Sequence, residues 1–311
     1  MTSRAAVGVT DPSVSVGSLT FPNPIMTASG TSGHGVELAP YGDLAKLGAV
    51  VVKSLAAYQW DGNRAPRVHP TPQGMINAVG LQGPGVPAWI RDDLPGLASI
   101  GARVVVSIWG RSVADYELAA SQLAAVGPEV VAVEVNLSCP NLEGRRGIFA
   151  HDPVLSAEVM SATASCGRPR WAKLSPNTDR LVEVAGAVHE AGAEAVTLIN
   201  TVLAMVIDQR TRRPALGNGG GGLSGRAVHP VAVRAIYDVH AALPTLAIVG
   251  VGGVATGWDA AELMLAGASA VQVGTAIFAD PRAPWKVLED LAAWADREGI
   301  GALRLLTGAA G

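Results

Sequence analysis

The chain has 311 residues, of which 49% are hydrophobic, and a formal net charge of −3. This length and apolar content allow one large domain or two modest ones, and the near-neutral charge gives no reason to expect binding to nucleic acid or to an anionic membrane surface. Because the chain has only two cysteines, it has neither a disulfide framework nor the four thiolates that an iron–sulfur cluster normally takes.

The first residues predict no targeting segment. Residues 1–17 lack the continuous apolar core of a secretory signal. No later run reaches the roughly 18 apolar residues that a membrane-spanning helix needs. We therefore expect a cytoplasmic protein in a reducing environment.

Short apolar runs, rich in β-branched residues, recur along the chain, and each predicts a buried β-strand. In chain order they span residues 23–29, 49–54, 103–108, 130–136, 170–175, 195–200, 245–250 and 270–275. Amphipathic stretches between many of them predict helices, as at 113–126, 179–191, 228–242 and 258–266. Gly48, Gly192 and Gly267 stand where helix ends are expected.

Buried strands that alternate with helices predict a parallel sheet covered by helices. Eight such units in a chain of this length favour a closed (β/α)₈ TIM barrel over an open doubly wound sheet. Residues 13–21 exceed the repeat and predict a hairpin that caps the bottom of the barrel. Residues 55–85 and 202–217 are long excursions after strands, which we expect to cover the C-terminal face. No linker is visible, so a single domain over residues 1–311 is expected.

Polar residues gather where the predicted strands end, which in a barrel is where the chemistry lies. Lys53, Asn136, Lys173 and Asn200 all occupy such positions. One lysine at a strand end is often structural. Two lysines and two amides on the same barrel mouth are harder to explain as structural, and they indicate an active site.

Glycines after the last two strands fit the phosphate site of a barrel, where backbone N–H groups hold the anion. The alternative, that residues 250–255 form a Rossmann G-x-G-x-x-A turn, lacks a second nucleotide-binding half and a suitably spaced acid. A phosphate site with lysines and amides suits a phosphorylated cofactor and an anionic, amide-bearing substrate. The lysines are equally compatible with Schiff-base chemistry, as in barrel aldolases.

The stretch "EVNLSCPN" at residues 134–141 places one of the two cysteines, Cys139, just after a strand. Its position past the strand end, between Asn136 and Asn141, argues against a buried structural thiol. A disulfide or a metal site lacks further ligands, and we predict no metal. The other thiol, Cys166, is interpreted as structural.

The motifs taken together are similar to those of a known family. "NPIMTASGTSGHG", "VVKS", "GMINAVGLQGPG", "VEVNLSCPN", "KLSPN", "LINT", "GGLSG", "VGGV" and "AGASAVQVGTAIF" occur in the order and at the spacing seen in dihydroorotate dehydrogenases. The resemblance covers residues 20–285 or so and is greatest to the catalytic subunit of the NAD-linked class 1B enzymes. Class 2 enzymes carry a serine at the position of Cys139 and a membrane-associating N-terminal extension.

The resemblance implies an enzyme that uses flavin mononucleotide (FMN) to oxidise (S)-dihydroorotate to orotate in pyrimidine biosynthesis. It also implies a homodimeric core and a partner subunit, carrying FAD and an iron–sulfur cluster, that passes electrons to NAD⁺. Alternatives are a self-contained class 1A enzyme that uses fumarate, a flavin oxidoreductase of another dihydropyrimidine-like ring, and an inactive flavin-binding homologue.

The same resemblance assigns site residues. Cys139 would be the catalytic base, and Lys53 would also belong to the catalytic group. The residues implied to contact FMN are Ser29, Lys53, Ser54, Ser107, Asn136, Lys173, Ile199, Gly225, Gly252, Gly253, Gly274 and Thr275. The residues implied to surround the substrate are Lys53, Asn77, Val79, Gly80, Leu81, Asn136, Asn141, Asn200 and Thr201.

Three features depart from the family pattern. Ser107 stands where asparagine is usual, and Gly83 stands where asparagine is common. The segment 142–153 only approximates the mobile active-site loop of the family. These differences affect the substrate and the partner more than the flavin.

Overall fold

The computed structural model describes residues 10–138, 140–141 and 147–311. A sheet of eight parallel strands lies at its centre, in the order β3-β16-β15-β12-β11-β8-β7-β4. The two ends of this sheet meet through a parallel bridge between Met26 and Ala49. The strands are β3 (Ile25–Thr27), β4 (Val50–Val51), β7 (Val104–Ile108), β8 (Val130–Asn136), β11 (Arg170–Lys173), β12 (Ala195–Leu198), β15 (Ala247–Val251) and β16 (Ala270–Val273). The predicted TIM barrel and its eight strands are confirmed.

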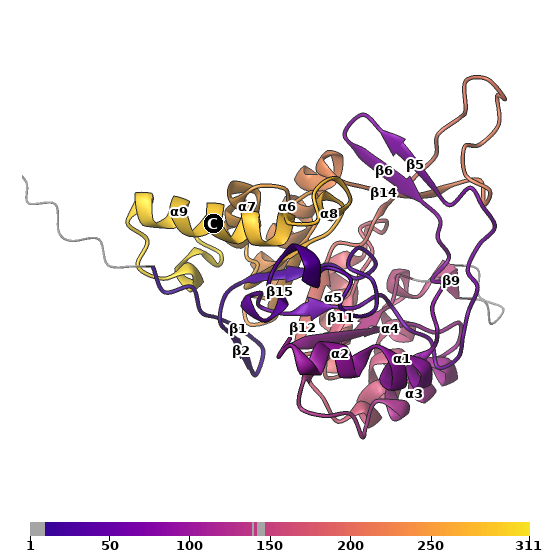
Figure 1. Ribbon diagram of the computed structural model, residues 1–311, viewed down its shortest axis with the longest axis horizontal. Coiled ribbons are helices and arrows are strands. Elements are labelled where there is room, and N and C mark those ends of the chain that lie inside the picture. Colours follow the sequence, from indigo (N-terminus) through magenta and orange to yellow (C-terminus); the bar gives the residue numbers. More distant parts are fainter. Residues whose placement is uncertain (1–9, 139, 142–146) are drawn as a thin grey trace, which may run out of the picture.

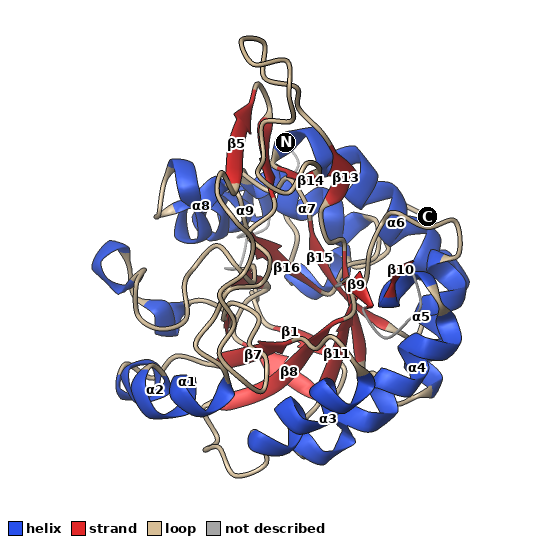
Figure 2. Ribbon diagram, turned by 90° about the vertical axis from the view of Figure 1, so that its right-hand side faces the viewer, coloured by secondary structure: helices blue, strands red, loops and turns tan. Residues whose placement is uncertain are grey.

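Helices form the outer layer of the barrel, around the strands (Figure 2). They are α1 (Val86–Asp92), α2 (Leu94–Ser99), α3 (Val113–Gln122), α4 (Pro153–Ala162), α5 (Leu181–Glu190), α6 (His229–Ala242), α7 (Gly257–Leu265), α8 (Ala276–Ala279) and α9 (Ala283–Glu298). Short 3₁₀ helices span Ala39–Tyr41, Leu44–Lys46, Phe149–His151, Thr163–Cys166, Arg226–Val228 and Leu303–Leu306. Of the helices in the described ranges, none combines the length and the apolar character needed to cross a membrane.

Local sequence explains where several helices begin and end. The Ser112 side chain accepts a hydrogen bond from the N–H of Asp115 and begins α3, and Thr256 and Asp259 form a capping box at α7. Gly192, after α5, adopts the left-handed conformation with φ +94°. Gly48 differs from the prediction, because it follows a 3₁₀ helix and has no positive φ. A Cβ there would lie 2.5 Å from the carbonyl oxygen of Asn23, so glycine is required by close backbone approach.

The predicted hairpin at residues 13–21 is also confirmed. Strands β1 (Val14–Val16) and β2 (Leu19–Phe21) pair antiparallel. The hydroxyl of Ser18 donates to Glu194, 2.5 Å away, and Glu194 directly precedes β12. The hairpin therefore packs at the N-terminal ends of the barrel strands, on the face opposite the site described below.

The two long excursions, the second of which extends past its predicted end at residue 217 to Ser224, combine into one antiparallel sheet on the C-terminal face, above the barrel at the upper right of Figure 1. Its strands β5 (Val68–Thr71), β6 (Gly74–Asn77), β13 (Val202–Ala204) and β14 (Gly221–Ser224) lie in the order β13-β14-β6-β5. A Cβ at Gly221 would approach the carbonyl oxygen of Asn77 to 2.5 Å, so the glycine-rich strand allows close pairing. A second, two-stranded sheet pairs β9 (Pro140–Asn141) with β10 (Gly147–Ile148).

Candidate active site

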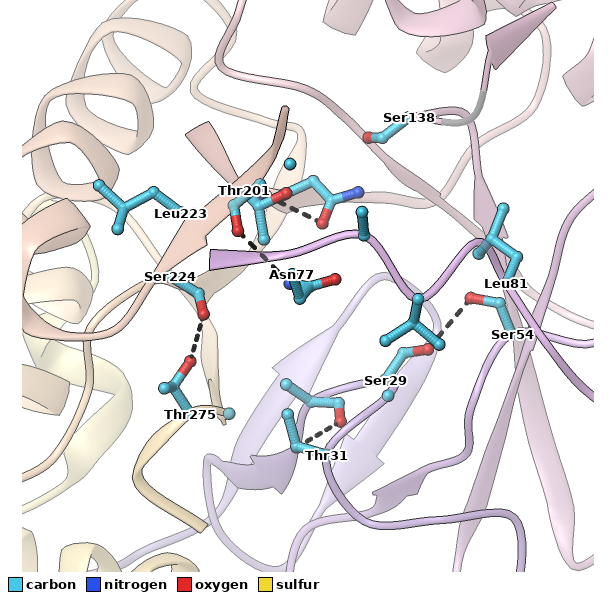
Figure 3. Close-up of a pocket in the computed structure, with 18 of the residues that line it drawn as sticks. Ser29, Thr31, Ser54, Asn77, Leu81, Ser138, Thr201, Leu223, Ser224 and Thr275 are labelled. Carbon is cyan, nitrogen blue, oxygen red and sulfur yellow. Dashed lines mark hydrogen bonds between the residues drawn. The ribbon is translucent and has the colours of Figure 1, made fainter. Parts of the chain in front are cut away.

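A cavity of about 730 Å³ opens at the C-terminal ends of the barrel strands. Its volume lies within the roughly 300–1,000 Å³ typical of small-molecule and cofactor sites. Strand ends form its floor, and β6, β13 and β14 contribute to its walls. Figure 3 shows some of the residues that line it, among them Ser29, Ser54 and Thr201.

Most of the residues assigned from the sequence line this one cavity. They are Ser29, Lys53, Ser54, Asn77, Val79, Gly80, Leu81, Asn136, Lys173, Ile199, Asn200, Thr201, Gly225, Gly252, Gly253, Gly274 and Thr275. Ser107 is not part of the wall: it is fully buried and its hydroxyl contacts that of Ser54, so a direct contact with a cavity ligand is not supported. Asn141 lies in β9, and Cys139 lies outside the described residues.

The charge distribution of the cavity is one-sided. Lys53, Arg111 and Lys173 line it, whereas the described lining residues include no aspartate and no glutamate. The described charged side chains that line the cavity are thus all cations, although the chain as a whole carries a net charge of −3. A partly enclosed cavity with this lining favours anionic ligands.

Strand register places the floor residues next to one another. Lys173 is paired with Asn136 of β8 on one side and with Thr197 of β12 on the other. The side chain of Lys173 is 6% exposed, and its nearest acidic group is Glu134, with Nζ 3.8 Å from Oε1. The lysine and the asparagine therefore reach the cavity side by side, as the C-terminal ends of adjacent parallel strands should.

A chain of hydroxyl groups runs along one side of the floor. The Ser54 hydroxyl lies 3.1 Å from that of Ser29 and 2.8 Å from that of Ser107 (Figure 3 shows the first contact). The Asn136 amide donates to the same Ser54 oxygen over 3.2 Å. Ser54 thus fixes the orientation of the asparagine that faces the cavity.

On the opposite wall, polar groups from the excursions face the strand ends. The Thr201 N–H donates to the Asn200 side-chain oxygen over 2.9 Å, which holds that amide against the end of β12. Thr275 and Ser224 join the excursion sheet to the end of β16 through a hydrogen bond of 2.8 Å (Figure 3). These bonds tie the cover to the barrel around the cavity.

Glycines form a cradle at the ends of β15 and β14. Gly252 and Gly253 have φ values of +145° and +72°, and Gly225 has φ +99°. A Cβ at Gly253 would lie 2.7 Å from the Cβ of His229. The His229 ring lies 2.8 Å from the carbonyl oxygen of Gly252 and 3.0 Å from Glu262, so it anchors this loop from behind. Such a bare backbone can approach a phosphate closely.

The family model for dihydroorotate dehydrogenase matches residues 13–294. The chain belongs to the dihydroorotate dehydrogenase family. Curated relatives from Geotalea uraniireducens and Desulforudis audaxviator carry the name dihydroorotate dehydrogenase B (NAD(+)), catalytic subunit. The first is 44% identical over 97% of this chain and 99% of its own length, and the second is 49% identical over 96% of each.

A further relative, from Solibacter usitatus, is 44% identical over 89% of this chain and 91% of its own length. It is provisionally named dihydroorotate dehydrogenase A (fumarate). Relatives of similar identity therefore carry names that specify two different electron acceptors.

The dihydroorotate dehydrogenase family implies a flavin cofactor, and this chain's residues fit one. At Gly225, Gly252 and Gly253, which line the cavity, a Cβ would lie within 2.7 Å of neighbouring protein atoms, so the backbone there stays bare and can approach a phosphate closely. The adjoining cavity is lined by amide, hydroxyl and ammonium groups, which can bond to the polar edge of a flavin ring.

Several cavity residues were not foreseen from the sequence. Trp60 lines the cavity from the first excursion, with the Arg111 guanidinium 4.9 Å from its ring centre and Trp109 packed edge-on at 6.2 Å. For Trp109 and Arg111, the signal in the sequence was the polar turn "WGRS", which directly follows the strand at 103–108. Glu134, buried below the floor, was also overlooked, although a charged residue inside the apolar run 130–135 is itself unusual.

Proposed function

We propose that this chain oxidises (S)-dihydroorotate to orotate in pyrimidine biosynthesis, with FMN as its flavin. The observation that carries the proposal is the one-sided cavity: three cations and a glycine cradle, with no acid among the described lining residues. FMN has a phosphate and dihydroorotate a carboxylate, so both molecules are anions that such a cavity favours.

The placement of the residues supports a proposed set of flavin contacts. We propose that the glycine cradle holds the phosphate and that the flavin ring lies against the strand ends. The proposed contacts are Ser29, Lys53, Ser54, Asn136, Lys173, Ile199, Gly225, Gly252, Gly253, Gly274 and Thr275, with Ser107 acting through Ser54. When bound, FMN supplies a hydride acceptor for C6 of the substrate.

The chain's own groups bind the substrate and move its proton. Asn77, Asn136 and Asn200 can each donate to and accept from a pyrimidine ring, and Lys53 can balance the carboxylate. Cys139, outside the described residues, is proposed to take the proton from C5, a role worth about 10²–10⁴ in rate. Val79, Gly80, Leu81, Asn141 and Thr201 complete the proposed substrate site.

For the electron acceptor, we propose NAD⁺, reached through a separate FAD and iron–sulfur subunit. Relatives named B (NAD(+)), catalytic subunit, support this, and two cysteines are too few for a cluster in this chain. The second candidate is direct use of fumarate, which the Solibacter relative favours. We further propose a single cytoplasmic domain with a homodimeric core.

The decisive experiment measures orotate formation by the purified chain. We expect a yellow protein that releases FMN on denaturation and forms orotate with an artificial electron acceptor. Dihydrouracil, which lacks the carboxylate, should be a poor substrate if the cations recognise that group. A colourless protein, or one that prefers dihydrouracil, would contradict the proposal.

The acceptor is tested separately. Dihydroorotate oxidation is followed with NAD⁺ or with fumarate, each with and without a co-expressed flavin and iron–sulfur subunit. NAD⁺ reduction only in the presence of that subunit would support the first candidate. Fumarate-dependent turnover by the chain alone would support the second.

A further inference from the structure

A layer of buried polar side chains lies directly beneath the cavity floor. Glu134, Thr197 and Gln272 are each 0% exposed, and they come from three different barrel strands. One carboxylate oxygen of Glu134, Oε2, accepts a hydrogen bond from Thr197 Oγ1 at 3.0 Å and another from Gln272 Nε2 at 2.9 Å. These bonds fix the carboxylate within the barrel interior, which is otherwise mainly apolar.

The second oxygen of Glu134, Oε1, is directed at the cavity floor. It has no hydrogen-bond partner and lies 3.8 Å from Nζ of Lys173. At this separation the carboxylate and the ammonium form an ion pair, but they are too far apart for a hydrogen bond. Lys173 lines the cavity and Glu134 does not, so the ammonium lies between the carboxylate and the cavity.

Burial makes the two charges depend on each other. An isolated charge in a protein interior is strongly disfavoured, and removing one member of a buried pair leaves the other uncompensated. Lys173 is almost fully enclosed, and Glu134 is the acidic group that the structure pairs with it. The glutamate therefore compensates the buried ammonium and helps to hold it at the floor.

We propose that Glu134 is a positioning residue that keeps a charged Lys173 at the cavity floor. Through that lysine it sets how strongly the cavity favours the reduced, anionic flavin over the oxidised form. This inference rests on the proposed function, because it takes FMN as the occupant. Glu134 itself touches neither flavin nor substrate in this proposal.

The direction in which the reduction potential of the flavin changes separates this role from simpler ones. In Glu134→Gln, Lys173 should lose its place, so the floor loses the cation that the carboxylate holds there. We expect the reduced form to be disfavoured at least tenfold relative to the oxidised form, a fall of about 30 mV in the two-electron reduction potential. If Glu134 acted only by its own negative charge, its removal would raise the potential. If its role were merely structural, the potential would not move. Either result would overturn the proposal.

Matched variants test whether Glu134 acts on the flavin through Lys173. Lys173→Met should lower the potential to a similar degree, and adding Glu134→Gln to it should cause no further fall. Thr197→Val removes one hydrogen bond to the carboxylate at nearly constant volume but leaves the charge, so its potential should stay close to that of the parent. A further fall in the double variant would show that Glu134 acts by another path.

Thermal unfolding of the flavin-free protein gives a readout that needs no cofactor. Each single variant leaves one member of the buried pair without its partner, so the double variant should melt above both. If Glu134→Gln does not fold, recovery of folding in the double variant supports the ion pair, and failure to recover refutes it. A parent protein without flavin would contradict the proposed function alone, since this unfolding cycle would still test the pair.

Discussion

The Ser54 hydroxyl contacts three other side chains along one side of the cavity floor, so the stability lost on removing it can be estimated. Its oxygen contacts the hydroxyls of Ser107 and Ser29 at 2.8 and 3.1 Å, and it accepts from the Asn136 amide at 3.2 Å. Ser54→Ala deletes this one oxygen and alters packing very little. The fully buried Ser107 hydroxyl then loses this bond.

The expected loss of stability follows from these bonds. Leaving a buried hydroxyl unsatisfied costs about 1–3 kcal/mol, and each ordinary hydrogen bond contributes about 0.5–1.5 kcal/mol. We therefore expect Ser54→Ala to lower the free energy of unfolding by about 2–4 kcal/mol. With an unfolding entropy of about 2.1 cal/mol/K per residue, a chain of 311 residues should melt about 3–6 °C lower.

The assay is thermal unfolding at one fixed, saturating FMN concentration, because loss of bound flavin would itself lower the melting temperature. Ser107→Ala alone should cost about 1 kcal/mol. The double variant should be no less stable than Ser54→Ala, since it removes the hydroxyl left unsatisfied. Fully additive losses in the double variant would refute the reasoning.

Three further predictions concern the glycine cradle, a half-buried histidine and the proposed catalytic thiol. Gly253→Ala places a side chain at φ +72°, with its Cβ 2.7 Å from that of His229. About 1–2 kcal/mol of strain should weaken FMN binding about five- to thirty-fold, as measured by flavin fluorescence. Burial lowers the pKa of His34 below its ordinary 6.5, so folding favours the neutral ring. Its stabilising contribution is complete above about pH 6.5 and is lost as the pH falls, so His34→Gln should lose less stability between about pH 7 and pH 5. Cys139→Ala should keep its flavin, while stopped-flow reduction by dihydroorotate slows about 10²–10⁴-fold.

The glycine and the thiol predictions each have a control variant within the chain. Gly299 shares the φ value of +72° but has nothing within 4 Å of its Cβ position, so Gly299→Ala should leave FMN binding unchanged. The other thiol, Cys166, is buried, and Cys166→Ala should not slow flavin reduction. For His34, a parent protein whose stability does not change over this acidic range would contradict the assignment.

The barrel could be predicted from sequence because its signals are local. Each strand is a short apolar run, and each polar strand end faces the mouth once the strands are parallel. This placed Lys53, Asn136, Lys173 and Asn200 around what proves to be one cavity. The roles of these residues remain predictions from resemblance.

The features that were missed depend on contacts between distant segments. Residues 217–225 resemble a flexible glycine tract, yet Gly221–Ser224 is a strand because its partner, Gly74–Asn77, lies far away in the chain. The contact of Ser107 with Ser54 and the pairing of Glu134 with Lys173 likewise join residues that are far apart in the chain. No periodicity in the sequence encodes which side chains meet across a barrel.

The sheet formed by the two excursions also determines how this wall of the cavity can move. Strands β6 and β14 share a hydrogen-bonded ladder, so the excursions after β4 and β12 cannot open as independent flaps. Any motion of this wall must move them as one unit, so amide exchange in both segments should occur at a common rate.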